Sequence, residues 1–237
     1  HGEPRAGERR LAAYYACEQL GTEDAADRCE VLRVSVDCGK VMGALGTQQV
    51  LASLGATVVA LNANVDGRFP GRPSKPTPDT LSDFRAFMTD GAFDLGIAHD
   101  GDADRIVLLD GDGGIVHEDT IVAMLAGYYT HRSSTEHGVS DPVVVTTPNA
   151  SGRIDEVVAD AGGRVERVRL GAPHEGIAAA ENDGDVVFAA EPWKHIHPAF
   201  GGWIDRIGHA ALLTGLVAAA ALACPPDPHP RPPPPQR

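Results

Sequence analysis

Three aspartates alternate with small residues in the segment His99-Asp-Gly-Asp-Ala-Asp-Arg105. It lies between two apolar stretches, 93–98 and 106–109, which predicts a loop between two strands. Three hard oxygen donors that converge in a turn suit an octahedral Mg²⁺ ion. The alternative is an acidic hairpin turn, but three like charges without a cation would repel one another in a desolvated loop. We therefore predict that Asp100, Asp102 and Asp104 bind Mg²⁺ and that Arg105 faces an anion.

Two better-known aspartate motifs do not fit this loop. The three aspartates match the first ligands of an EF-hand, but Arg105 stands where that loop requires Gly and Gly111 where it requires Glu. A haloacid-dehalogenase-type phosphatase would carry Thr or Val where Asp104 stands. The later segment 110–114 is typical of a β-turn rather than a second metal site.

Composition excludes several classes of partner and compartment. The 237 residues carry 33 acidic and 20 basic side chains, a net charge of -13. Such a chain repels a phosphodiester backbone, so we expect no nucleic-acid partner. The four scattered cysteines predict neither a disulfide framework nor a thiolate zinc site. The apolar segment 210–224 is shorter than the ~20 residues that cross a bilayer, and residues 1–10 lack the apolar part of a signal peptide. We expect no membrane association and a cytoplasmic location.

The elements that position the aspartate loop follow a repeated order. A predicted strand at 31–36, a helix at 43–54 and a strand at 57–61 form a βαβ unit, followed by a helix at 80–89 and the strand at 93–98. The same order returns about 110 residues later, with strands at 142–146, 164–170 and 185–189 and a helix at 150–161. Ligands of open α/β sheets bind beyond the carboxyl ends of strands, which is where the aspartates lie.

Two consecutive α/β domains of similar topology are the simplest fold for this pattern. We expect a linker over 1–30 with a short helix near 11–20, one domain over 31–110 and a second over 111–224. The second domain would end in a buried helix at 210–224. Eight prolines within 225–237 predict a tail without sheet structure.

Several motifs together resemble the α-D-phosphohexomutases, the phosphomannomutase and phosphoglucomutase family. The run Asp-Gly-Asp-Ala-Asp-Arg (100–105) is similar to the magnesium loop of that family. Asp-Gly-Arg-Phe-Pro-Gly (66–71), with Pro73 and Pro76, resembles its DGxFPxxxPxP segment. Ala-Glu-Pro-Trp-Lys-His (190–195) resembles its sugar-binding G-E-P-S-G-H loop, and 169–177 resembles the stretch upstream of that loop. The resemblance covers about residues 31–224 and implies mixed-sheet α/β domains, the second and third of four.

The resemblance also implies roles for individual residues. Glu191 would accept hydrogen bonds from two sugar hydroxyls, and His195 would serve as a general acid or base. Arg105, the other catalytic residue, would orient a phosphate or sugar oxygen. Trp193 and Lys194 replace the Ser and Gly of the family loop, and we expect the indole to stack on a sugar ring and the ammonium to meet a phosphate. The other histidines 174, 197 and 209 are expected to be surface or satisfied residues.

The function that the resemblance implies is a Mg²⁺-dependent phosphohexomutase acting on mannose, glucose or glucosamine phosphate. The family's phosphoserine segment, Thr-Ala-Ser-His-Asn-Pro, and its phosphate clamp of the Ser-Gly-Thr-Glu-Pro type do not occur in this sequence. We therefore expect a fragment that is inactive alone. Two alternatives stay open: a non-catalytic remnant that binds metal and sugar phosphate, and a metal-dependent sugar phosphatase.

Overall fold

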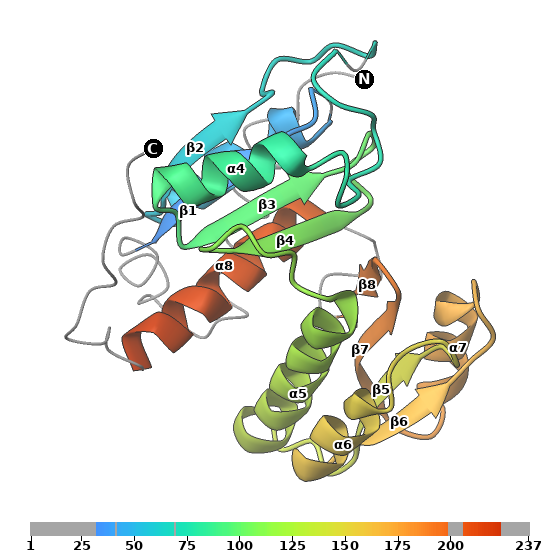
Figure 1. The fold of residues 1–237 in the computed structure, drawn as a ribbon. Helices are drawn as coiled ribbons and strands as arrows, with labels where there is room; N and C mark the ends of the chain where they lie inside the picture. Colours follow the sequence, from blue (N-terminus) through green and yellow to red (C-terminus); the bar gives the residue numbers. More distant parts are fainter. Residues whose placement is uncertain (1–31, 41, 69, 199–205, 224–237) are drawn as a thin grey trace.

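The computed structural model describes residues 32–40, 42–68, 70–198 and 206–223. The linker over 1–30, its short helix and the proline-rich tail lie outside these residues. Two four-stranded sheets dominate the fold, and in each of them three strands run parallel and the last runs antiparallel. Figure 1 shows the first sheet above and the second below, each with its own helices. The predicted pair of mixed-sheet α/β units of similar topology is confirmed.

The first sheet has the order β2-β1-β3-β4. Its strands are β1 (Arg33–Asp37), β2 (Thr57–Leu61), β3 (Leu95–His99) and β4 (Ile106–Asp110). Their buried side chains alternate between two apolar clusters, one on each face. A parallel sheet needs such cover on both faces. Because β1 and β3 are parallel neighbours in the sheet, their carboxyl ends lie at the same edge.

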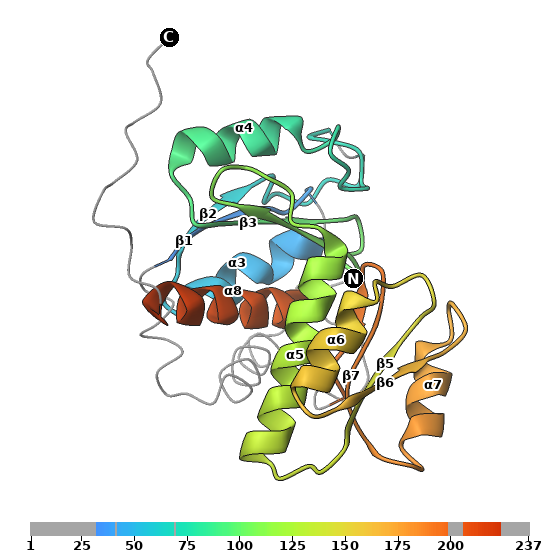
Figure 2. The same cartoon turned by 60° about the horizontal axis from the view of Figure 1, so that its bottom comes forward.

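Helices cover both faces of this sheet. The 3-10 helix η1 (Met42–Leu45) and α3 (Thr47–Ser53) replace the single helix predicted over 43–54. On the opposite face, α4 (Ser82–Gly91) buries Phe84 and Met88. The long helix α8 (Arg206–Ala223) packs against α3, although the sequence placed it with the second unit. Figure 2 shows α3 and α8 side by side below the sheet and α4 above it.

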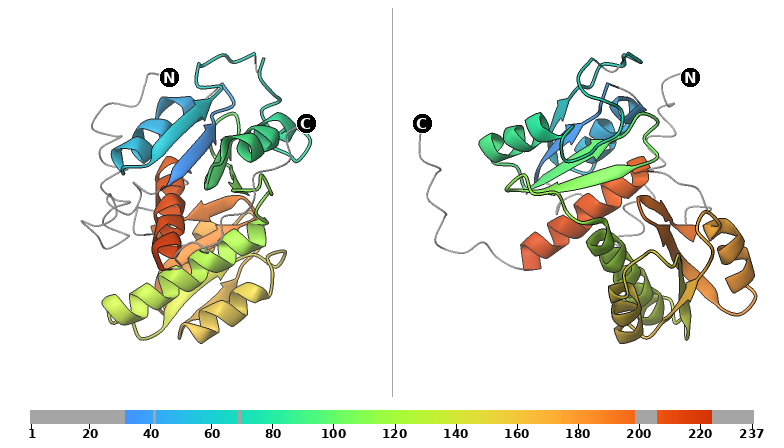
Figure 3. Two further views of the ribbon diagram at one scale, coloured as in Figure 1. Left: turned by 60° about the vertical axis from the view of Figure 1, so that its left-hand side comes forward. Right: turned by 45° about the vertical axis from the view of Figure 1, so that its right-hand side comes forward.

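The second sheet repeats the pattern as β6-β5-β7-β8. Its strands are β5 (Pro142–Thr146), β6 (Arg164–Arg167), β7 (Asp185–Glu191) and β8 (Lys194–Ile196). Helices α5 (Glu118–Glu136) and α6 (Arg153–Asp160) cover one face and α7 (Pro173–Ala180) the other. Each sheet with the helices that cover it forms one half of the molecule, and the two halves are visible as separate layers in both views of Figure 3. Domain boundaries at 110 and 224 stay a prediction.

Within the described part of the chain, no helix combines the length and the apolar character that a bilayer crossing requires. The cytoplasmic location stays a prediction from the sequence.

Candidate metal and sugar-phosphate site

The aspartate loop lies at the carboxyl end of β3, in the turn that leads into β4. Asp100 is buried, Asp104 half-buried and Asp102 exposed, and one carboxylate oxygen from each lies within 4.8 Å of the others. Ala103 adopts a left-handed conformation with φ 56°, a strained state for a residue with a side chain. The strained turn brings the three predicted ligands together.

The donor set of this loop fits a hard divalent cation. The buried Oδ2 of Asp100 forms an ion pair with Nε of Arg105 at 2.5 Å, but within the described residues it accepts no hydrogen bond of good geometry. Burial raises the pKa of Asp100. For Asp104, burial acts in the same direction, but hydrogen bonds with Asp100 and Arg105 outweigh it and lower the pKa. Carboxylate oxygens are the ligands that Mg²⁺ prefers, so the loop offers a chemically suitable set.

Arg105 is held beside these carboxylates while it stays open to a ligand. Its backbone N–H donates to Oδ1 of Asp100 at 3.1 Å, and its Nε lies 3.3 Å from Oδ1 of Asp104. The side chain is 37% exposed. A guanidinium in this place can bind an anion without leaving the loop.

A buried ion pair behind the loop sets the position of β3. Nε of Arg72 lies 2.5 Å from Oδ2 of Asp37, and the same guanidinium donates to the carbonyl of His99 at 2.5 Å. Both side chains are almost fully buried. Asp37 also accepts from the N–H of Gly39 and from the side chain of Asn62, each at 2.9 Å. The ends of β1, β2 and β3 are therefore tied together immediately before Asp100.

The imidazole of His99 packs against the start of the α3 region. Its Nε2 hydrogen-bonds Oγ1 of Thr47 at 2.9 Å. A side-chain carbon at Gly43 would come within 2.8 Å of the His99 ring, so only glycine allows this close approach. His99, which precedes the first predicted metal ligand, is thus packed on its ring side as well as held through its carbonyl.

The predicted sugar-binding residues lie on the tight hairpin between β7 and β8. Glu191 is 8% exposed, and its carboxylate accepts from the N–H of Gly171 at 3.0 Å. Nζ of Lys194 lies 3.5 Å from Oε1 of Glu191. Trp193 is 49% exposed and takes a left-handed conformation with φ 62°. The hairpin therefore presents an indole and an ammonium around a largely covered carboxylate.

His195 has a different environment from the rest of the hairpin. Its side chain is fully buried, with Nε2 2.6 Å from Oε1 of Glu118 and Nδ1 3.1 Å from Nε2 of His209. The acid–base role of His195 stays a prediction. With both ring nitrogens bound inside the protein, any proton exchange with a ligand would pass through Glu118.

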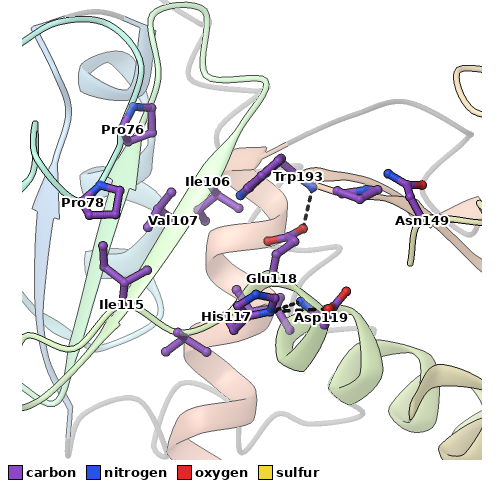
Figure 4. A pocket seen from close by; sticks show the side chains of 13 residues that line it. Pro76, Pro78, Ile106, Val107, Ile115, His117, Glu118, Asp119, Asn149 and Trp193 are labelled. Carbon is purple, nitrogen blue, oxygen red and sulfur yellow. Dashed lines mark hydrogen bonds and ion pairs between the residues drawn. The ribbon is translucent and has the colours of Figure 1, made fainter. Parts of the chain in front are cut away.

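A cleft of about 380 Å³ separates the two halves beside this hairpin. Figure 4 shows Pro76 and Pro78 on one side and Trp193 and Asn149 on the other, with Glu118 between them. The wall formed by Ile106 and Val107 directly follows the aspartate loop. The three aspartates and Glu191 are not among the lining residues of this cleft. It therefore adjoins the two predicted loops without containing their carboxylates.

Three residues with structural roles in this site were not predicted from the sequence: Arg72, its partner Asp37, and Glu118. Arg72 lies within the Pro- and Gly-rich segment that carried the resemblance, but nothing in its spacing indicated that it pairs with Asp37, 35 residues earlier. Glu118 contacts a hairpin 75 residues away through the N–H of Trp193. Predicting such pairs requires the fold, whereas the aspartate loop is local in the sequence.

Cys38 follows β1 directly and is fully buried. Burial, with a smaller effect of Asp37, raises the pKa of its thiol to about 12. We expect this thiol to stay unmodified by Ellman's reagent in the native chain at neutral pH, because the reactive thiolate is absent. Peptide mass spectrometry before and after denaturation measures this. Modification of Cys38 in the native chain at the rate of a free thiol would contradict the packing described.

Comparisons with known proteins show the family to which this chain belongs. Residues 15–113 match the family model described as phosphoglucomutase/phosphomannomutase, alpha/beta/alpha domain II. Over 186 residues, 78% of this chain, the sequence is 42% identical to the phosphopentomutase of Thermococcus kodakarensis. The chain belongs to the phosphohexomutase family. Over 167 residues it is also 40% identical to the probable phosphoglucosamine mutase of Methanopyrus kandleri.

Solved structures of the phosphohexomutase family share the fold. A phosphoglucomutase/phosphomannomutase family protein from Burkholderia thailandensis superposes with a TM-score of 0.66 at 20% identity, covering 91% of this chain and 47% of that one. This chain covers 39% of the Thermococcus relative and 35% of the Methanopyrus relative. The chain thus spans less than half the length of the phosphohexomutases to which it is compared.

Proposed function

We propose that this chain carries the metal-binding and sugar-binding loops of a phosphosugar mutase, an isomerase that transfers a phosphoryl group within a sugar phosphate. One observation supports the proposal above the others: the carboxylates of Asp100, Asp102 and Asp104 converge at the carboxyl end of β3. They do so in a chain whose relatives include a phosphopentomutase and a phosphoglucosamine mutase.

The residues of the loop 100–105 have separate roles in binding the phosphoryl group. Asp100, Asp102 and Asp104 would hold Mg²⁺, which when bound neutralises the charge on a transferring phosphoryl group. Arg105 binds a phosphate oxygen through the exposed part of its guanidinium. The Arg72–Asp37 pair keeps the carbonyl of His99, and with it the start of the loop, in place.

The hairpin residues bind the sugar. Glu191 accepts hydrogen bonds from two neighbouring hydroxyls, since a carboxylate has the acceptor capacity for both. Lys194 supplies a positive charge for the phosphate, and the indole of Trp193 stacks on the ring. His195 contributes to acid–base chemistry through Glu118, which it contacts at 2.6 Å.

The substrate class that we propose is a hexose phosphate, in line with the family resemblance. The 42% identity to a protein named phosphopentomutase supports a second candidate, a pentose phosphate. Competition between glucose 1-phosphate and ribose 1-phosphate for the same chain separates the two, because the tighter ligand displaces the other.

The proposed binding is tested with purified chain, MgCl₂ and glucose 1-phosphate, followed by calorimetry. We expect saturable binding that Glu191→Gln weakens by about 10- to 100-fold, the effect of losing hydrogen bonds to a charged group. Glu156→Gln is the matched control, because Glu156 is an exposed carboxylate on α6 of the same half. Equal binding by the two variants, or no binding by the wild type, would refute the assignment of the hairpin.

A coupled assay with glucose 1-phosphate and its bisphosphate measures turnover by the same preparation. We expect no glucose 6-phosphate, because the 237 residues contain no Ser-His-Asn-Pro segment to carry the phosphoserine. Formation of glucose 6-phosphate would contradict the expected inactivity. Release of inorganic phosphate would instead favour the phosphatase alternative.

A further inference from the structure

Five buried polar side chains form a continuous chain behind the β7–β8 hairpin. The hydroxyl of Tyr129 lies 2.9 Å from Nδ1 of His197, and Nε2 of His197 lies 2.8 Å from Nδ1 of His209. Nε2 of His209 lies 3.1 Å from Nδ1 of His195, whose Nε2 is 2.6 Å from Oε1 of Glu118. The chain connects α5, β8 and α8 and uses all six imidazole nitrogens. Of its five members, His195 alone lies in a motif that carried the family resemblance.

The surroundings of this chain leave its rings little freedom. The three histidines are at most 1% exposed, Tyr129 4% and Glu118 8%. The Tyr129 ring stacks on Phe188 at 5.5 Å, and Phe188 also contacts the rings of His195 and His197. A buried polar network of this kind specifies one arrangement when every member is satisfied.

The carboxylate end of the chain determines the direction of its hydrogen bonds. The carboxylate of Glu118 can only accept, so Nε2 of His195 must donate to it. At the other end, burial raises the pKa of Tyr129, which keeps its hydroxyl proton available for donation. With neutral imidazoles, the Glu118 end requires one order, in which each histidine carries its proton on Nε2 and accepts at Nδ1, and the Tyr129 hydroxyl completes this order by donating to Nδ1 of His197.

Glu118 transmits this order to the hairpin. The same Oε1 that accepts from His195 also accepts from the backbone N–H of Trp193 at 2.7 Å. Trp193 needs such support, because its left-handed backbone is a costly conformation for a non-glycine residue. Glu118 is the first residue of α5, where the helix dipole favours a negative charge.

We propose that Tyr129, His197, His209 and His195 are positioning residues that act through Glu118 to hold the Trp193 turn in its ligand-binding conformation. In this arrangement all three histidines are neutral Nε2–H tautomers. The role of this turn in ligand binding rests on the proposed function, but the positioning of the turn does not. The two measurements that test the positioning require neither a sugar phosphate nor a metal.

The first measurement is the ¹⁵N NMR of the histidine rings in the full chain at neutral pH. Single His→Gln variants assign the three signals among the ten histidines of the sequence. We expect each of His195, His197 and His209 to show a protonated Nε2 and an unprotonated Nδ1. A protonated Nδ1 on any of them would overturn the proposed order.

The second measurement is hydrogen exchange at the backbone amide of Trp193. His209→Leu removes the hydrogen bond at Nδ1 of His195, so the ring loses one of the two contacts that fix its orientation and its hydrogen bond to Glu118 is weakened. We expect exchange at Trp193 to become about 2- to 12-fold faster, the effect of weakening one hydrogen bond. His209→Gln keeps one donor and one acceptor and is expected to restore slow exchange.

The amide of Gly171 controls for a general loss of stability, because it donates to Glu191, a carboxylate of the hairpin that is not part of the histidine chain. Its exchange should be unchanged in both variants. Equal exchange at Trp193 in wild type and His209→Leu would overturn the proposal, as would a Leu variant in which both amides accelerate equally. If His209→Leu does not fold, the tautomers in the wild type and the Gln variant decide the question.

Discussion

Replacing Arg72 by alanine should lower the free energy of unfolding by about 3–5 kcal/mol, the cost of leaving a buried charge without its partner. Asp37 would be that charge: its side chain is 3% exposed and its Oδ2 lies 2.5 Å from Nε of Arg72. The variant would also lose the hydrogen bond from the guanidinium to the carbonyl of His99, which precedes the aspartate loop. Urea unfolding followed by circular dichroism measures the change.

Arg68 provides a matched control four residues earlier in the same segment. It pairs with Asp66 at 3.0 Å, but its side chain is 88% exposed, against 5% for that of Arg72. Exposed pairs contribute little to stability, so Arg68→Ala should unfold at the same urea concentration as the wild type. The double variant Asp37→Asn/Arg72→Met removes both buried charges and should recover part of the loss. An Arg72→Ala curve that superposes on the Arg68→Ala curve would refute the importance of burial.

Magnesium should stabilise the wild-type chain and leave Asp102→Asn nearly unaffected. Binding to the folded state alone, at 100 times the dissociation constant, contributes about 2.7 kcal/mol, or about 5–10 °C in melting temperature for a chain of this size. Without metal, the variant should be the more stable of the two proteins. Asp102→Asn removes one of three negative charges that lie within 4.8 Å of one another, so the variant should melt at a higher temperature than the wild type.

Differential scanning fluorimetry with and without MgCl₂ measures both effects. Asp102 is exposed, so its substitution leaves the core packing intact. CaCl₂ in place of MgCl₂ separates a general divalent site from one that prefers the smaller ion. A wild type that melts at the same temperature with and without MgCl₂ would contradict metal binding. A metal-free variant that melts below the metal-free wild type would contradict repulsion among the three carboxylates.

The parts of the fold with a local cause were predictable from the sequence. The strands at 57–61 and 142–146 have the predicted bounds, because each is a continuous apolar run that follows a turn. The predicted helix over 43–54 is instead divided at Gly46, which separates η1 from α3. Helix α5 was missed altogether. Ten of its 19 residues are buried, so the helix lacks the wide polar face that marks an amphipathic helix in a sequence.

The candidate site divides in the same way. Asp100, Asp102 and Asp104 lie within five residues, so a single turn brings them together and the sequence alone could indicate it. The hydrogen bond from Trp193 to Glu118 joins a hairpin to a helix 75 residues earlier. The burial of His195 likewise depends on α8, which approaches from the first half of the molecule. Such contacts follow from the packing of whole elements, which no local pattern encodes.

The central claim is that the loop 100–105 binds a divalent cation, and calorimetric titration of the purified chain with MnCl₂ tests it most directly. We expect one site per chain in the wild type and no detectable heat of binding in the triple variant Asp100→Ala/Asp102→Ala/Asp104→Ala. Circular dichroism of the variant serves as the control for its folding. Identical binding heats in the two proteins would contradict the account.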